Sequence, residues 1–235
     1  MRKQPQNPIF TAIDKNDLDV AKSLGAAIAP HTGGIKLGKE FFTCFGPQGV
    51  LDVVGQETPL FLDLKFHDIP NTVAGAVRAA AKSVAPNMLT IHGCGGGDMI
   101  RAASEASAEF GDARPWILAV TVLTSMDNAD LAATGVAHDI ANQVQRLAAL
   151  AQENGADGVI CSPLEIAALR AQCGPDFKLV VPGIRPTGSH HGDQKRVKTP
   201  VEALNDGADY LVIGRPITGA ANPADAVSNI AKDLI

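Results

Sequence analysis

Short apolar runs alternate along the chain with longer stretches in which apolar residues recur at helical spacing. The short runs are rich in valine, isoleucine and leucine, a composition typical of buried parallel strands. The longer stretches, such as Thr72–Ala85 and Asp139–Asn154, are expected to form amphipathic helices. The predicted strands are Ile9–Ile13, Gly34–Leu37, Leu60–Lys65, Met88–His92, Ile117–Leu123, Gly158–Cys161, Leu179–Val181 and Tyr210–Ile213.

This alternation predicts an α/β fold in which parallel strands are joined by right-handed helical crossovers. Eight strand–helix units within 235 residues fit a closed (β/α)8 TIM barrel. No linker, low-complexity segment or shift in composition divides the chain, so we expect a single domain over residues 1–235. An open doubly wound sheet gives the same alternation and stays as the alternative, because periodicity does not report closure.

A polar cluster interrupts the apolar pattern at the end of the third predicted strand. Because side chains alternate along a strand, Asp63 and Lys65 are expected on one face, about 6–7 Å apart along the backbone. Leucines and Phe66 take the other face. Opposite charges inside a barrel are costly unless they are paired or used in chemistry. A buried ion pair that only fixes packing is the simpler interpretation, although such pairs seldom add net stability.

Polar residues also follow the third strand and mark the ends of others. Asp68 comes just after the strand, and Thr72 opens the next helix, where donors favour anions or caps. Further candidates at strand ends are Asp14, Lys36, Thr124 and Ser125. Each alone could be a cap or a solvated end. Because the carboxyl ends of barrel strands meet at one mouth, two carboxylates and two ammonium groups are expected to converge there.

The same mouth carries a candidate phosphate site. Gly214 and Arg215 follow the eighth strand, where barrels commonly bind phosphate through backbone N–H groups and a helix N-terminus. A polar loop at residues 183–199 follows the seventh strand and contains Arg185 and Gln194. Loops of this length in compact domains are usually lids or binding loops, so we expect it to close over the phosphate. An arginine solvated at the rim is the alternative interpretation of Arg215.

Three other motifs suggest cofactors but have simpler explanations. His67 has no second histidine or carboxylate at metal-ligand spacing, which favours a structural or solvent-facing role over that of a base or ligand. Residues 92–97 are glycine-rich but lack the G-x-G-x-x-G spacing of a dinucleotide site. Loop composition explains the pair His190–His191 at least as well as metal binding does. We therefore expect no metal and no cofactor.

Composition narrows the class of protein further. The formal net charge is -5 and no long basic run is present, which argues against a nucleic-acid partner. No apolar run approaches the ~18 residues needed to cross a bilayer, and no apolar export signal stands at the N-terminus. The 4 cysteines have no C-x-x-C spacing, as expected of reduced thiols. These features predict a soluble cytoplasmic protein without a membrane partner.

The run Asp63-Leu64-Lys65-Phe66-His67-Asp68-Ile69-Pro70-Asn71-Thr72 resembles the signature of the orotidine 5'-monophosphate decarboxylases. Similar motifs follow in the family's order over nearly the whole chain, and they are most similar to the bacterial branch. The departures, Ile13 in place of a commoner leucine and a divergent N-terminus, do not touch the chemistry. The matching motifs are Ala12-Ile13-Asp14, Lys36-Leu37-Gly38-Lys39-Glu40, Val120-Thr121-Val122-Leu123-Thr124-Ser125-Met126, Pro182-Gly183-Ile184-Arg185-Pro186, Gly192-Asp193-Gln194 and Gly214-Arg215-Pro216.

The resemblance implies cofactor-independent decarboxylation of orotidine 5'-monophosphate to uridine 5'-monophosphate, the last step of de novo pyrimidine nucleotide synthesis. It implies a homodimer with sites at the interface, in which Lys65 protonates C6 of the pyrimidine. Lys36, Asp63 and Lys65 would form an alternating charge array with Asp68 of the other subunit. The substrate-binding residues that it implies are Asp14 and Lys36 for the ribose, Thr72 from the partner, Thr124 and Ser125 for the pyrimidine, and Gln194, Gly214, Arg215 and the loop residue Arg185 for the phosphate.

Two rival functions stay open. A magnesium-dependent sugar-phosphate decarboxylase or aldolase of the same barrel type is similar in its Asp-x-Lys-x-x-Asp element, and a Schiff base on Lys65 is a variant of that hypothesis. From another class, a non-catalytic barrel would only bind a phosphorylated nucleotide. Binding alone does not require the charged set of Lys36, Asp63, Lys65 and Asp68, which favours an enzyme.

Overall fold

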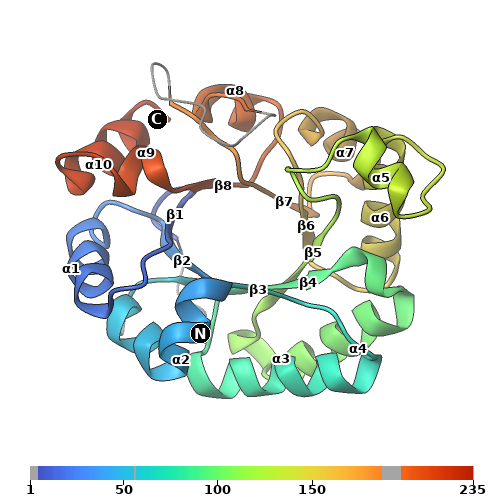
Figure 1. Ribbon diagram of the computed structural model, residues 1–235, viewed down its shortest axis with the longest axis horizontal. Coiled ribbons are helices and arrows are strands. Elements are labelled where there is room, and N and C mark those ends of the chain that lie inside the picture. Colours follow the sequence, from blue (N-terminus) through green and yellow to red (C-terminus); the bar gives the residue numbers. More distant parts are fainter. Residues whose placement is uncertain (1–4, 56, 187–196, 235) are drawn as a thin grey trace.

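The strands form one closed parallel barrel. The computed structural model describes residues 5–55, 57–186 and 197–234. Each strand pairs with the next in sequence, and β8 pairs with β1 (Figure 1). This closure confirms the predicted (β/α)8 barrel and excludes the open sheet. The strands are β1 Ile9–Ile13, β2 Gly34–Gly38, β3 Leu60–Phe66, β4 Met88–His92, β5 Trp116–Val120, β6 Gly158–Ile160, β7 Lys178–Val181 and β8 Tyr210–Ile213.

The end of the fifth strand was predicted wrongly, whereas the other strands agree with prediction to within one residue. β5 ends at Val120 rather than Leu123. The backbone N–H and the hydroxyl of Thr121 both donate to the carbonyl oxygen of Ile160, at 3.3 and 3.0 Å, which ends the regular ladder. The N–H of Met126 then donates to the carbonyl oxygen of Leu123, so the chain turns away into a loop.

Helices surround the barrel and cover the outer face of the sheet (Figure 1). The predicted helices Thr72–Ala85 and Asp139–Asn154 correspond to α3 and α6. The described helices are α1 Leu18–Ile28, α2 Lys39–Val54, α3 Pro70–Val84, α4 Gly97–Ala108, α5 Asn128–Ala133, α6 Ile140–Glu153, α7 Ile166–Cys173, α8 Pro200–Asn205, α9 Arg215–Thr218 and α10 Pro223–Lys232, with short 3-10 turns η1 Gly93–Gly95 and η2 Gly111–Ala113.

Local sequence explains how α3 and α6 begin. α3 starts at Pro70, because the fixed φ of proline suits the first helical position. α6 starts after Asp139, whose side chain accepts a hydrogen bond from the N–H of Asn142.

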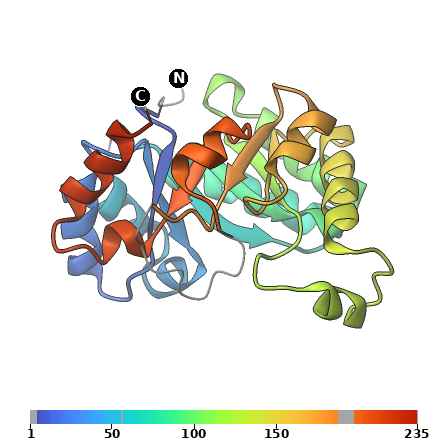
Figure 2. The same cartoon turned by 90° about the horizontal axis from the view of Figure 1, so that it is seen from above.

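Figure 2 shows α5 projecting beyond the ring of helices. None of the helices in the described ranges combines the length and apolar character that a membrane span needs.

The core has two layers, one on each side of the sheet. Between the strands and the helices lies a large aliphatic cluster that contains, among others, Leu62 and Ile91. Inside the barrel, Phe10, Phe61 and Met88 are at most 1% exposed, and the rings of the two phenylalanines pack edge to face with centroids 6.1 Å apart. We call these three residues the lumen plug. They lie near the N-terminal ends of their strands. The polar side chains inside the barrel lie at the other end, where the strands end.

Side chains from loops cap alternate strands at the N-terminal face of the barrel. Asn87 accepts a hydrogen bond from the first N–H of β3 at 3.1 Å. Asp157 accepts a hydrogen bond from the N–H of Ile117, the second residue of β5, at 2.8 Å, and Asp209 accepts one from the N–H of Leu179, the second residue of β7, at 2.9 Å. Each capping residue directly precedes the next strand in sequence, so one carboxylate or amide ties two neighbouring strands together. This face therefore contributes to stability rather than to chemistry.

Candidate active site

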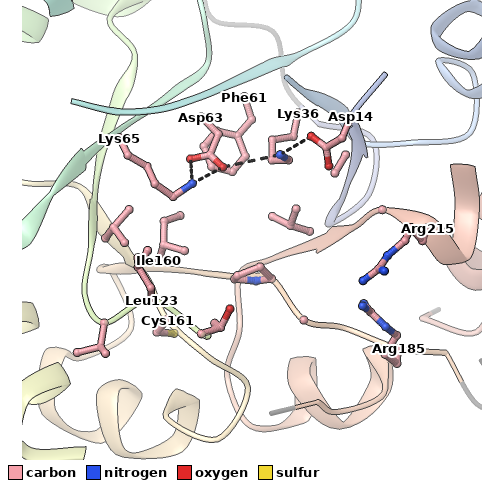
Figure 3. Close-up of a pocket in the computed structure, with 18 residues that line it drawn as sticks. Asp14, Lys36, Phe61, Asp63, Lys65, Leu123, Ile160, Cys161, Arg185 and Arg215 are labelled. Atoms are coloured by element: carbon pink, nitrogen blue, oxygen red, sulfur yellow. Dashed lines mark hydrogen bonds and ion pairs between the residues drawn. The ribbon is translucent and has the colours of Figure 1, made fainter. Parts of the chain in front are cut away.

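Asp63 and Lys65, at the end of β3, form the closest charged pair at the barrel mouth. Lys65 Nζ lies 2.7 Å from each carboxylate oxygen of Asp63 (Figure 3). Both side chains point into the mouth, as predicted, whereas Leu62 and Leu64 pack on the helix side of the sheet. The strand is not regular here, because the main chain of Lys65 has a φ of 52°. Alternation alone did not predict that irregularity.

Lys36, on β2, extends the pair into a chain of alternating charges. Its Nζ lies 3.3 Å from Oδ1 of Asp14 and 3.8 Å from Oδ2 of Asp63. The order along one wall of the mouth is therefore Asp14, Lys36, Asp63, Lys65 (Figure 3). The Lys36 side chain is only 11% exposed, against 58% for that of Asp14. The Asp14 end of the array is therefore the exposed one.

The surroundings of Asp63 keep its carboxylate ionised. Burial on its own would raise the pKa of Asp63. The charges of Lys36 and Lys65, together with hydrogen bonds from Lys65 and Thr90, outweigh burial and hold the pKa below its usual value of 3.8. Asp63 is therefore a fixed negative charge at neutral pH.

Two arginines stand on the β7–β8 side of the same cavity (Figure 3). Arg215 is the first residue of α9, directly after Gly214. Arg185 is 8% exposed; its N–H donates to the carbonyl oxygen of Lys198 at 2.9 Å, and its Nη1 donates to that of Ile184 at 2.9 Å. The bond to Lys198 joins the start and the end of the loop after β7, and the bond to Ile184 holds the guanidinium at the start of the loop. The arrangement presents positive charge where a phosphate was predicted.

Apolar side chains line the part of the cavity that faces Lys65. Leu123 lies there, in the loop after β5, together with Ile160, the last residue of β6, and Cys161, which follows it (Figure 3). The cavity has a volume of about 430 Å³, and Phe61 of the lumen plug lines its floor. Sequence reasoning missed this wall, because apolar residues at strand ends look like ordinary core. The signal that could have found them is their interior-facing register at the carboxyl ends of the strands.

The predicted binding residues divide into those that reach the cavity and those that do not. Thr124 lines the cavity, whereas Ser125 is exposed beside it. Asp68 and Thr72 are exposed on the rim, at the turn before α3 and in its first turn, and do not line the cavity of this chain. The Oδ1 of Asp68 accepts a hydrogen bond from the N–H of Ile69 at 2.6 Å. Gln194 lies outside the described residues.

His67 and the glycine-rich run lie close to other side chains outside the charge array. The ring of His67 lies against that of His92, with centroids 5.3 Å apart, and His67 is exposed. Residues 93–95 form the short η1 turn, and a side chain at Gly95 would collide with Met99. In the described ranges, no group of three or more His, Cys, Asp or Glu side chains is arranged to hold a metal ion. The pair His190–His191 lies outside those ranges.

A barrel mouth with an array of alternating charges, an apolar wall and two arginines has the character of an enzyme active site for an anionic small molecule. Comparisons with known proteins specify the family. The model of the orotidine 5'-phosphate decarboxylase / HUMPS family matches residues 7–230. The orotidine 5'-phosphate decarboxylase of Rhodospirillum rubrum is 54% identical over 240 residues, covering 100% of this chain and 97% of that protein. That of Paramagnetospirillum magneticum is 52% identical over 232 residues, covering 97% and 98%.

A solved structure shows the same relationship. The crystal structure of orotidine 5'-phosphate decarboxylase from Lactobacillus acidophilus superimposes with a TM-score of 0.87 at 36% identity, covering 97% of this chain and 99% of that one. The chain therefore belongs to the orotidine 5'-phosphate decarboxylase / HUMPS family, as its motifs predicted. It is an enzyme of the carboxy-lyase class.

Proposed function

We propose that this enzyme converts orotidine 5'-monophosphate to uridine 5'-monophosphate and carbon dioxide without a cofactor, as the last step of de novo pyrimidine nucleotide synthesis in the cytoplasm. The observation that carries the proposal is the placement of Lys36, Asp63 and Lys65 on one wall of a cavity that also holds Arg185 and Arg215. The substrate has a carboxylate on its base and a phosphate on its ribose. Two cationic regions in one cavity suit these two anionic groups.

Lys65 supplies the proton in this proposal. When the bond between C6 and the carboxylate carbon breaks, carbon dioxide leaves and the electron pair stays on C6. Conjugation does not spread that pair, because it lies in the plane of the pyrimidine ring. An ammonium group beside C6 stabilises the charge and then transfers a proton to form the C6–H bond. The 2.7 Å contacts to both oxygens of Asp63 support this role, because they fix where the ammonium sits.

Asp63 has a second effect on the substrate carboxylate. Two negative charges 4 Å apart repel each other by about 4 kcal/mol in a medium of intermediate dielectric. Loss of neutral carbon dioxide moves the negative charge from the carboxylate to C6, beside the Lys65 ammonium, and proton transfer then neutralises it. Asp63 therefore disfavours the bound substrate relative to the product. The depressed pKa of Asp63 supports the role, because a protonated carboxyl group would not repel.

The remaining residues bind the parts of the nucleotide that do not react. Asp14 and Lys36 contact the ribose hydroxyls, and Thr124 and Ser125 contact the edge of the pyrimidine. The residues that bind the phosphate are Gln194, Gly214, Arg215 and the loop residue Arg185. Phosphate binding is remote from the bond that breaks, so its energy can close the loop and align the charge array. Nucleosides without the phosphate should therefore lose turnover as well as affinity.

The active enzyme in this proposal is a homodimer whose sites lie at the interface. Asp68 would complete the charge array of the neighbouring subunit, and Thr72 would approach the ribose there. Both are exposed on the rim of the mouth rather than in the cavity of their own chain. Ile69, next to Asp68, is 67% exposed, and an apolar side chain on that rim suits contact with a second copy.

The test is to follow ultraviolet absorbance of orotidine 5'-monophosphate with the purified enzyme. We expect the substrate spectrum to change to that of uridine 5'-monophosphate, with the same rate after treatment with EDTA. Loss of activity with EDTA and its recovery with Mg²⁺ would favour a metal-dependent enzyme. Covalent trapping of substrate on Lys65 by borohydride would favour a Schiff base. Binding without any spectral change would identify a non-catalytic barrel.

A further inference from the structure

A bulge in β3 sets the position of the charged pair. Leu62 pairs with Leu89 of β4, and Phe66 pairs with Ile91. Three residues of β3 therefore lie opposite the single residue Thr90. Such an irregularity removes ladder hydrogen bonds and redirects side chains, and bulges are frequent beside active sites. The residues in this bulge include Asp63 and Lys65. The geometry of the bulge therefore sets the orientation of the Asp63 carboxylate relative to the Lys65 ammonium.

Thr90 satisfies the backbone that the bulge leaves unpaired. The N–H of Lys65 donates to Oγ1 of Thr90 at 2.8 Å, in place of a ladder bond. Lys65 has a φ of 52°, a left-handed conformation that residues with a Cβ rarely adopt unless the surroundings enforce it. The hydroxyl of Thr90 is thus a direct restraint on that conformation.

The same hydroxyl also holds the carboxylate. Thr90 Oγ1 donates to Oδ1 of Asp63 at 2.9 Å, and that oxygen also accepts from Lys65 Nζ. One oxygen atom therefore links the main chain of Lys65 to the side chain of Asp63. Thr90 is fully buried and is not among the described residues that line the cavity.

We propose that Thr90 is a positioning residue, whose hydroxyl sets the orientation of the Asp63 carboxylate and the Lys65 ammonium through the bulge of β3. The inference rests on the proposed roles of Asp63 and Lys65 in decarboxylation. Thr90 acts without touching the substrate. Its effect should appear in turnover and in the ionisation of Asp63, and only weakly in substrate affinity, because the ribose and phosphate contacts come from other strands.

The test compares Thr90→Val with Thr90→Ser. Valine keeps the shape and the β-branch but removes both hydrogen bonds, whereas serine keeps the hydroxyl. We expect Thr90→Val to lower kcat about ten- to a hundredfold with KM changed less than about threefold, because each lost bond involves a charged or strained group. Thr90→Ser should restore most of the turnover.

The pH profile separates positioning from mere loss of packing. Lys36 from β2, Lys65 from β3 and His92 from β4 are the charged or titratable groups that act on Asp63, along with the Thr90 hydroxyl. Because the Thr90 bond lowers the pKa of Asp63, the acid limb of the kcat profile should move to higher pH in Thr90→Val and stay in place in Thr90→Ser.

Thr11→Val is the matched control, because Thr11 is another fully buried strand threonine, paired with Thr32 at 2.9 Å. It should lower thermal stability without moving the acid limb. If Thr90→Val does not fold, Thr90→Ala removes the same hydroxyl and must show the same two effects. A folded Thr90 variant without hydroxyl that keeps kcat within twofold and an unmoved acid limb would overturn the proposal. Failure of the proposed function is distinguishable, because then the unaltered enzyme itself would not consume orotidine 5'-monophosphate.

Discussion

At the scale of single residues, a small number of contacts holds the ammonium group of Lys65 in place. Lys65 Nζ contacts both oxygens of Asp63, and the Lys65 side chain is 23% exposed. A flexible lysine in solvent would sample many rotamers. Here the bidentate contact and the bulge of β3 restrict it, so the entropy of ordering the proposed proton donor is lost on folding rather than during reaction.

Replacing Lys65 tests its role directly. Lys65→Ala should lower kcat by about a thousandfold or more, because both the stabilising charge and the proton are lost. Steady-state assays measure this, and calorimetry with uridine 5'-monophosphate should show that binding persists. Lys22→Ala, at an exposed position of α1, should leave kcat unchanged. Retention of more than about a tenth of the wild-type turnover in Lys65→Ala would mean that another group donates the proton.

His92 should be neutral near pH 7. Burial lowers the pKa of His92 below 6.5, and the positive charges of His67, Lys39 and Lys65 lower it further. Only Asp63 acts in the opposite direction. Because the unfolded chain then binds this proton more tightly than the folded enzyme does, His92 reduces stability as the pH falls below 6.5.

Lys39→Ala should therefore raise the pKa of His92 toward 6.5, by removing one of the nearby positive charges. An NMR titration of the ring protons measures the shift. Lys22→Ala serves again as the control and should leave the titration unchanged. A His92 pKa that stays put or falls in Lys39→Ala would contradict this account of its environment.

At the scale of elements, the two ends of the strands have different tasks. The carboxyl ends carry the charge array, whereas the amino ends are tied by Asn87, Asp157 and Asp209. Besides its hydrogen bond to β7, the Asp209 carboxylate forms ion pairs with Arg170 at 2.5 Å and with Lys178 at 3.2 Å. Stability and chemistry are thus separated along the length of each strand.

Asp209→Ala should destabilise the enzyme without impairing turnover. The change removes the acceptor for the N–H of Leu179 in β7 and leaves Arg170 without its carboxylate partner, which together cost about 2–4 kcal/mol. Urea unfolding measures the free energy of unfolding, and kcat at 25 °C should stay near the wild-type value. Glu109→Ala, which breaks an exposed pair with Arg78, should have little effect on either quantity. A large loss of kcat in a folded Asp209→Ala enzyme would contradict the separation.

At the scale of the whole molecule, the mouth of one chain holds only part of the proposed charge array. Lys36, Asp63 and Lys65 share a cavity, whereas Asp68 stands on the rim. A dimer of proposed geometry would give each site an Asp68 from its neighbour, so catalysis and assembly would depend on each other.

Mixing two inactive variants tests this dependence. Lys65→Ala and Asp68→Ala homodimers should each have low activity. After unfolding and refolding together in equal amounts, half of the dimers would be mixed and each would contain one intact site, giving about a quarter of the wild-type activity. Refolding each variant alone is the control. If the mixture is no more active than the variants alone, Asp68 does not act across an interface.

The sequence predicted the barrel and the charged residues because both depend on local patterns. Apolar runs mark buried strands, and charged residues at strand ends stand out against them. The bulge at residues 63–65 escaped prediction because it depends on the register with β4, which no single segment encodes. For the same reason Thr90 read as an ordinary strand residue, and the bonds of Thr121 that end β5 were not foreseen.

The lumen plug of Phe10, Phe61 and Met88 has a consequence for traffic through the site. These three side chains are buried inside the barrel at that level, so we expect molecules to enter and leave the cavity at the carboxyl ends of the strands. The substrate, the nucleotide product and carbon dioxide would then all pass through the same opening of the cavity. In the proposed reaction, carbon dioxide formed at C6 would have to pass the bound pyrimidine or leave together with the nucleotide, so the three apolar side chains of the lumen plug would constrain the order in which the products depart.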